Sequence, residues 1–337
     1  MSPLEPGRPS GRWARRPRRR ARSGAALRCL GVAIAAATAV SPILAHPGSG
    51  IAVDRAGRIF FVDTGHGVWM IDGEGRLREH EGPAFHWMAL DAESRFGETP
   101  LPHLPSTDLR AAGRDPIVIL SSDYPVAVGA DGALYFAEPG RDRRLRMVRL
   151  APSGERAEFA LLPAESEGAP LRWLNGVAAG GDGSIYYSEN AAVRRIDPHG
   201  DLSTVARAIE VPECERLPGL PPAMAPYLRG LAVAADGTVY AAANGCSALL
   251  RIGAGGEVAT ILRATPPWSP TAVAIGGEHL YVLEYLHTAE EEVADRRVWI
   301  PRVRRLAPDG AVTVMVEVRR EPPGRRPTPP LHRKKSN

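Results

Sequence analysis

Six polar residues occupy the same place in a repeated stretch of this sequence. Each stands directly before a short apolar run whose third residue is alanine. The six are Ser49, His86, Tyr124, Asn175, Arg229 and Thr271. Polar side chains that converge from several elements are what a binding pocket needs to orient a ligand. The alternative is that a residue at the start of a strand is simply polar or small. We favour the pocket and expect all six residues to bind ligand.

Four acids end the second apolar run of the repeat, and a fifth copy has Ala243 instead. They are Asp63, Glu138, Glu189 and Glu284. If these carboxylates gather, they can bind a cation or a basic ligand, and one of them would have a raised pKa. If they do not gather, each can cap a turn by accepting backbone N–H bonds. Both alternatives stay open.

The elements that position these residues are short strands joined by tight turns. The segment Leu174–Gly200 has three apolar runs separated by turns that include Gly-Gly-Asp-Gly, and such turns supply the positive φ angles of hairpins. The first apolar run appears six times, at intervals of 37, 38, 51, 54 and 42 residues. These intervals are typical of propeller blades. We therefore predict an all-β fold, a six-bladed β-propeller with four-stranded antiparallel blades.

The alanine at the third place of each first run supports this prediction. It is present in all six copies, at positions 52, 89, 127, 178, 232 and 274. The innermost strands of a propeller crowd around the axis, so we expect the alanines there, where side chains must taper. The copy that starts at Trp87 is the weakest, because a proline-rich stretch, Thr99–Pro105, follows its first strand.

The repeat resembles NHL repeats and the related SMP-30/gluconolactonase-like propellers. The likeness lies in units such as GIAVD at Gly50, IFFVD at Ile59 and the Ile-Asp-Pro-His-Gly turn that follows Arg195. The resemblance implies one divalent metal, Ca²⁺, Mn²⁺ or Zn²⁺, held by carboxylate and amide oxygens at the ring positions. Asn175 alone matches that pattern, so it is the metal ligand that the resemblance implies, and Arg229 would set a cation beside the metal.

Three functions follow as alternatives. The first is non-catalytic binding of a small molecule or extended peptide at the mouth of the central channel. The second is metal-dependent hydrolysis of a lactone or ester, in which Glu189 and Glu138 are the candidate catalytic residues. The third is a protein-interaction scaffold at the cell envelope. We favour the first, and we expect a monomer.

The two ends of the chain differ from its body. We divide it into an export signal or uncleaved anchor (1–45), the propeller (46–318) and a basic, proline-rich tail (319–337). The first 28 residues carry a net charge of +8 and the tail +6, which leaves −10 for the remainder of a chain whose total is +4. An acidic body offers no footprint for nucleic acid. An anchor would be the chain's only membrane contact.

The apolar stretch Cys29–Val40 follows a run of arginines, as in an export signal, although a disordered basic extension is the alternative. We expect the protein to be periplasmic, secreted, or anchored and facing outward. Cys214 and Cys246 are then an even pair in an oxidising compartment. They either form a disulfide or remain two buried thiols.

Overall fold

The structure, a computed structural model, describes residues 49–63, 66–81, 87–90, 96–98, 118–121, 125–166, 168–217, 225–286 and 299–318. Only the backbone is described for residue 81 and for the three short segments between 87 and 121. The expected signal at 1–45 and the tail at 319–337 lie outside these residues. No helix in the described part of the chain has the length and hydropathy that a membrane crossing requires.

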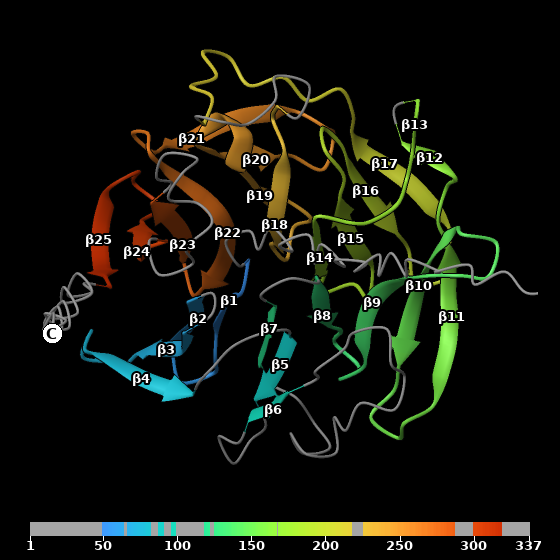
Figure 1. The fold of residues 1–337 in the computed structure, drawn as a ribbon, viewed down its shortest axis with the longest axis horizontal. Coiled ribbons are helices and arrows are strands. Elements are labelled where there is room, and N and C mark those ends of the chain that lie inside the picture. The colour runs from blue at the N-terminus through green and yellow to red at the C-terminus, as the bar shows by residue number, and fades with distance from the viewer. Residues whose placement is uncertain are drawn as a thin grey trace, which may run out of the picture. The chain divides into compact units, whose positions relative to one another are not determined.

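Five four-stranded antiparallel sheets form the blades of a β-propeller (Figure 1). The first blade has β1 (Ile51–Val53), β2 (Ile59–Asp63), β3 (Gly67–Ile71) and β4 (Leu77–Glu81). The second has β8 (Val126–Val128), β9 (Leu134–Pro139), β10 (Leu145–Leu150) and β11 (Arg156–Leu161). The third has β14 (Gly176–Ala179), β15 (Ile185–Ser188), β16 (Val193–Ile196) and β17 (Leu202–Ala206). The fourth has β18 (Leu228–Val233), β19 (Val239–Ala243), β20 (Ala248–Ile252) and β21 (Val258–Arg263). The fifth has β22 (Trp268–Gly276), β23 (His279–Leu286), β24 (Pro301–Leu306) and β25 (Val312–Glu317).

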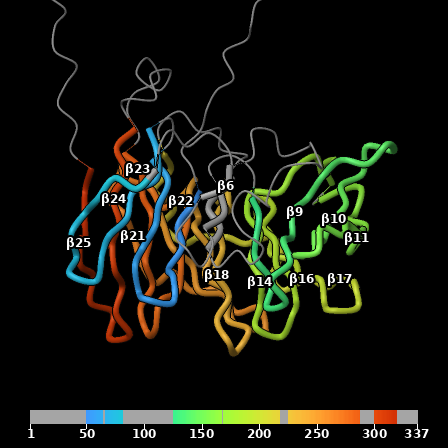
Figure 2. Tube along the Cα trace, turned by 90° about the horizontal axis from the view of Figure 1, so that it is seen from below, coloured from blue at the N-terminus to red at the C-terminus, as the bar shows by residue number. Residues whose placement is uncertain are grey.

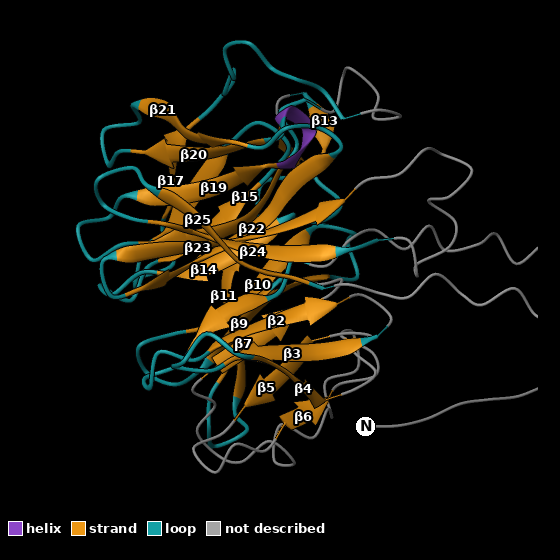
Figure 3. Ribbon diagram, turned by 90° about the vertical axis from the view of Figure 1, so that its left-hand side faces the viewer, coloured by secondary structure: helices purple, strands orange, loops and turns teal. Residues whose placement is uncertain are grey.

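Strands account for nearly all the regular structure, as Figure 3 shows. A short hairpin, β12 (Glu165–Ser166) and β13 (Ala169–Pro170), lies between the second and third blades in the chain. One helical turn among the described residues, η2 (Asn244–Cys246), follows β19. Within each blade the strands pair in chain order, so every blade is a continuous segment of sequence.

The prediction of six four-stranded blades is wrong in its count. Where the copy at Trp87 was expected to form a blade, there is a three-stranded sheet of β6 (Phe96–Glu98), β5 (Trp87–Leu90) and β7 (Val118–Ser121), in that order. Strand β7 contacts both β1 and β8, so β7 and not β5 faces the neighbouring blades. The reason is a non-local pairing: β5 takes β7, some thirty residues away in sequence, as its second partner.

The conserved geometry of the five blades explains the repeated alanine differently from our expectation. Each alanine of a first strand lies opposite an aromatic residue of the second strand, as Ala178 does with Tyr186. The other pairs are Ala52 with Phe60, Ala127 with Tyr135, Ala232 with Tyr240 and Ala274 with Tyr281. Ala178 and Tyr186 both belong to the core shared with the fourth blade. A small residue is therefore needed opposite the large aromatic ring in the space between two blades. The expectation that alanine is needed where side chains taper toward the axis did not include this contact.

In the part of the chain that the structure describes, the first and last blades meet through side chains and exchange no strand. Strand β22 of the fifth blade contacts β1 of the first, and the two blades share one apolar core. The Tyr285 hydroxyl donates a hydrogen bond to the carbonyl oxygen of Val62 across this junction. In Figure 1 the blue and red-brown strands accordingly lie side by side.

Candidate functional site

The direction of the inner strands distinguishes two ends of the propeller. The mouth end is the end at which β14, β18 and β22 begin. The turn end is the opposite end, where the hairpin that follows each of these strands makes its turn. Figure 2 shows the hairpin turns of successive blades together along one edge. Because a strand advances about 3.3 Å per residue, the four residues of β14 separate Asn175 from the turn at Gly180 by roughly 13–17 Å.

Asn175, Arg229 and Thr271 stand at the mouth end of three consecutive blades. Their strands are in contact from β14 to β18 and from β18 to β22. A Cβ placed on Gly176 would collide with the Arg229 carbonyl oxygen, so this glycine allows the two inner strands to approach. Arg229 and Thr271 also lie at β-bulges, which turn side chains away from the regular alternation.

The six predicted ring residues differ in accessibility. Asn175 and Ser49 are half-buried, whereas Arg229 is 4% exposed and Thr271 is fully buried. The Thr271 hydroxyl donates within its own blade to the carbonyl of Leu283 at 3.5 Å. His86 and Tyr124 lie outside the described residues. Of the six, the structure thus places four in consecutive blades, because β14, β18, β22 and β1, which carry or follow Asn175, Arg229, Thr271 and Ser49, contact one another in that order.

Each glutamate that ends a second strand forms an ion pair with an arginine of its own blade. Glu138 pairs with Arg156. Glu284 has no exposed surface and lies between two arginines, with Arg302 Nε 2.6 Å from Oε2 and Arg304 on the other oxygen. The arginines supply the opposite charge that buried carboxylates require.

Glu189 lies in a buried polar group at the mouth end of the third blade. Arg194 Nε is 3.4 Å from one carboxylate oxygen, and the Ser166 hydroxyl of the β12–β13 hairpin donates to the other. Burial raises the pKa of the neighbouring Tyr187 hydroxyl, and the negative charge of Glu189 raises it further, against the opposing effect of Arg194. That hydroxyl has no hydrogen-bond partner among the described residues.

These residues do not fit the divalent metal that the family resemblance implies. Asn175 is the one matching ligand, and the glutamates at the same end are held by arginines, whose charge opposes a nearby metal ion. Within the described ranges, no group of three or more His, Cys, Asp or Glu residues is arranged to hold a metal. We therefore assign no metal to Asn175 and no catalytic step to Glu189 or Glu138.

Trp173 is a mouth-end residue that the sequence reasoning missed. It stands two residues before Asn175, and it is 63% exposed. No other described tryptophan is among the exposed large hydrophobic residues. The sequence does show a tryptophan in the segment that leads into β14. Its exposure could not be predicted, because neighbours such as Leu171 and Leu174 are equally apolar.

Cys214 and Cys246 are joined by a disulfide, which is the first of the two alternatives given above. It ties the segment after the third blade to η2 of the fourth. Arg263 strengthens the same connection by donating to the carbonyl oxygens of Pro212 and Glu213. The segment before β18 is thus fixed to the blade at two points.

Comparisons with known proteins give no family. No protein-family model matches the chain, and no curated protein matches it either. Among solved structures, a streptogramin B lyase is 18% identical, with 82% of this chain and 84% of that chain covered and a TM-score of 0.47.

A calcium-binding protein, regucalcin, from Agrobacterium tumefaciens is 15% identical, with 75% and 89% covered and a TM-score of 0.49. A gluconolactonase from Xanthomonas campestris is 15% identical, with 71% and 83% covered and a TM-score of 0.45. These identities and scores are too low to support an argument about activity. The propeller fold rests on the strand topology described above.

Proposed function

We propose that this protein binds a small molecule or an extended peptide at its mouth end, without catalysis. The observation that carries the proposal is the exposure of Trp173 beside Asn175. A ligand that covers the indole gains from burying a large apolar surface, while the amide of Asn175 offers both a donor and an acceptor. Exposed tryptophans next to polar groups are frequent binding hot spots.

The ion pairs of the acids favour recognition over hydrolysis. A general base or metal ligand must have a carboxylate oxygen available to the reacting group. Glu284 and Glu138 are both bound by arginine. Glu189 accepts a hydrogen bond from Ser166 on one oxygen; its other oxygen lies 3.4 Å from Arg194 Nε and accepts no hydrogen bond from the described residues. The arginines therefore occupy Glu284 and Glu138, and we assign recognition of the ligand to Trp173 and Asn175.

The remaining expectations belong to the same proposal. We propose that the protein is exported and acts as a monomer in the periplasm, outside the cell or on the outer side of a membrane. The disulfide supports this location, since such bonds persist in oxidising compartments.

The proposal is tested by selecting ligands on the purified full-length chain from random-sequence peptides and from a metabolite library. We expect the Trp173→Ala variant to bind the selected ligands at least about tenfold more weakly, as is usual for a hot-spot tryptophan. Leu202→Ala removes a residue that is 43% exposed on the outer strand of the same blade, and it should bind normally. If selected ligands bind both variants equally well, or if none is selected, recognition at the mouth end is wrong.

Catalysis is tested separately with a chromogenic ester and an aldonolactone in the presence of Ca²⁺, Mn²⁺ or Zn²⁺. We expect no turnover above the rate in buffer. Metal-dependent turnover that Asn175→Ala abolishes would contradict the non-catalytic proposal and would establish the hydrolase alternative.

A further inference from the structure

Four of the four-stranded blades carry the same row of three residues near the turn end: an alanine, a tyrosine and an arginine on the first, second and third strands. Residues that lie opposite one another in antiparallel strands share one face of the sheet, so each arginine stands beside its tyrosine. The rows are Ala127, Tyr135 and Arg149; Ala178, Tyr186 and Arg195; Ala232, Tyr240 and Arg251; and Ala274, Tyr281 and Arg305.

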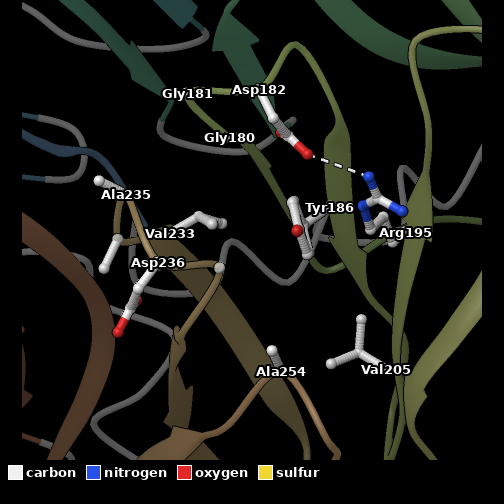
Figure 4. A pocket seen from close by; sticks show the side chains of 12 residues that line it. Gly180, Gly181, Asp182, Tyr186, Arg195, Val205, Val233, Ala235, Asp236 and Ala254 are labelled. Atoms are coloured by element: carbon white, nitrogen blue, oxygen red, sulfur yellow. Dashed lines mark hydrogen bonds and ion pairs between the residues drawn. The ribbon is translucent and has the colours of Figure 1, made fainter.

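In the second and third blades an aspartate of the adjoining turn supplies the counter-charge of this arginine. Asp131 accepts hydrogen bonds from Arg149, from Nε at 2.9 Å and from Nη2 at 2.7 Å, and another from the Tyr135 hydroxyl at 3.3 Å. Figure 4 shows the third blade, where Arg195 Nη2 lies 3.0 Å from Asp182. The arginine and the tyrosine thus form a carboxylate site that the chain itself fills.

The fourth blade has an aspartate at the same place in its turn. A hydrogen bond from the backbone N–H of Thr238 lowers the pKa of Asp236, and the charge of Arg251 lowers it further. Three consecutive blades therefore set a carboxylate of the turn against the arginine of the row.

The fifth blade has the tyrosine and the arginine but no aspartate in this turn. Four residues, 276–279, connect the paired residues Ile275 and Leu280, whereas five residues, 180–184, make the corresponding connection in the third blade. The shorter turn contains Glu278, whose side chain is exposed and forms no ion pair with Arg305.

Arg305 consequently has no counter-charge in the part of the chain that the structure describes. Its Nε is buried and has no hydrogen-bond partner there, and no ion pair involves this arginine. Arg149 and Arg195 are half-buried as Arg305 is, and both are paired with aspartate. A guanidinium removed from water without a partner is unfavourable, so an anion that binds it gains free energy.

The row of the fifth blade faces the first blade. Tyr281 packs against the apolar core that these two blades share, and a Cβ on Gly276 would lie 2.8 Å from the Tyr281 ring and 3.0 Å from Val53.

The acids at the turn end of the first blade already have partners. Arg58 binds Asp54, and Arg76 binds Asp72. Their charges are therefore balanced within their own turns, and an anion beside Arg305 meets little repulsion from them.

We propose that Arg305 and Tyr281 bind the carboxylate of a small monocarboxylic acid, between the fifth and first blades at the turn end. The carboxylate of the ligand takes the place that Asp131 has in the second blade, and it accepts hydrogen bonds from the guanidinium and from the Tyr281 hydroxyl. One carboxylate uses both donors, whereas an amide of the same shape leaves the guanidinium without a counter-charge. This site is independent of ligand recognition at the mouth end.

Two probes of one shape, benzoate and benzamide, test the requirement for charge. Both are titrated into the full-length chain at low ionic strength and followed by ligand-observed NMR. We expect benzoate to bind with a Kd of about 1 mM and benzamide to bind about tenfold more weakly, because it makes no charge-assisted hydrogen bond. Equal affinities for the two probes, or no saturable binding of benzoate up to about 10 mM, would overturn the proposal.

Substitutions locate the bound carboxylate. Arg305→Gln should weaken benzoate at least about tenfold. Arg195→Gln is the matched control, because it removes the equivalent arginine of a blade that has its own aspartate, and it should leave the affinity unchanged. The proposal is wrong if Arg305→Gln binds benzoate as the wild type does, or if both variants lose the same affinity.

Glu278→Gln tests whether the exposed acid of the turn is the partner of Arg305. We expect this variant to bind benzoate within about twofold of the wild type, because Glu278 forms no ion pair with the arginine. An affinity that rises tenfold or more, on the order of one charge-assisted bond, would show that Glu278 occupies the site and would contradict the proposal.

A turn graft supplies the carboxylate from the chain itself. Replacement of residues 276–279 by the five residues 180–184 gives the fifth blade the turn of the third, with an aspartate beside Arg305. We expect this variant to lose benzoate binding and to melt at an equal or higher temperature. The same graft with asparagine instead of aspartate is the control, and it should still bind benzoate. If both grafts melt like the wild type and bind benzoate equally, the carboxylate site is refuted.

Discussion

At the scale of single residues, the strongest electrostatic feature is the buried Glu284. Arg302 and Arg304 bind its two oxygens, and the guanidinium of Arg302 also lies 4.0 Å from the centroid of the Trp268 ring. Arg304 further donates to the carbonyl of Arg263. Glu284 thus ties the second strand of the fifth blade to the third, and Arg304 of the third strand connects to the fourth blade.

We expect Glu284→Gln to lower the free energy of unfolding by about 3–5 kcal/mol, because it leaves two arginines without their buried counter-charge. Glu138→Gln is the control: the Glu138 side chain is 23% exposed and faces one arginine, so the loss should be at most about 1 kcal/mol. Urea denaturation at neutral pH measures both. Equal losses of unfolding free energy in the two variants would show that the buried Glu284 ion pairs stabilise the protein no more than the Glu138 pair does.

Aspartates at the tight turns make the fold sensitive to acid. Backbone hydrogen bonds, first that of Arg76, lower the pKa of Asp72 from 3.8 to about 2. A carboxyl whose pKa is lower in the folded state stabilises the protein above its unfolded pKa, and that stabilisation is lost as the pH falls through the folded value.

We therefore expect the melting temperature to fall between about pH 4 and pH 2, and Asp72→Asn to reduce the steepness of that fall. Calorimetry at several pH values gives the comparison. If the melting temperature of the variant falls with pH as steeply as that of the wild type, Asp72 does not contribute to the acid sensitivity.

At the scale of elements, each blade depends on a small residue opposite a ring. Ala178 of β14 lies opposite Tyr186 of β15, and both pack into the core toward the fourth blade. The same partnership in every four-stranded blade makes it a condition for stacking one blade on the next.

We expect Ala178→Leu to cost about 1–3 kcal/mol through overpacking. The double variant Ala178→Leu, Tyr186→Val should cost less than the sum of the two single changes, because the shorter side chain makes room for leucine. Additive losses in thermal or urea unfolding would contradict the contact.

Much of the strand and turn structure of the blades could be predicted from the sequence, because the patterns that indicate strands and turns are local. The turns at Gly180–Gly183 and Gly253–Gly256 and the strands around them follow from alternation and glycine chemistry. The pairing of β5 with β7 could not, since non-local partners leave no local pattern. Likewise, Arg194 was visible in the sequence, but its position beside Glu189 depends on the strand register.

At the scale of the whole molecule, closure of the ring depends on the junction of the first and last blades. Tyr285 is fully buried there, and its hydroxyl donates to the Val62 carbonyl, 223 residues away in sequence. Among the described strands none is exchanged between these blades, and side chains of both blades pack together at the junction.

We expect Tyr285→Phe to destabilise the protein by about 1–3 kcal/mol, because a buried carbonyl loses its donor. Tyr281→Phe, on the same strand but half-buried, should change stability by less. Hydrogen exchange should show the loss concentrated in β1, β2 and β23, and protection lost evenly over all blades would argue against a local role in closure.

The central claim is that ligands are recognised beside Trp173, at the mouth end of the propeller. It is tested by ¹⁹F NMR of the chain labelled with 5-fluorotryptophan, in which the Trp173 resonance is identified by its absence from Trp173→Phe. A ligand selected on the protein should shift this resonance and leave that of the buried Trp299 in place. A selected ligand that saturates the protein without moving the Trp173 resonance would contradict the account.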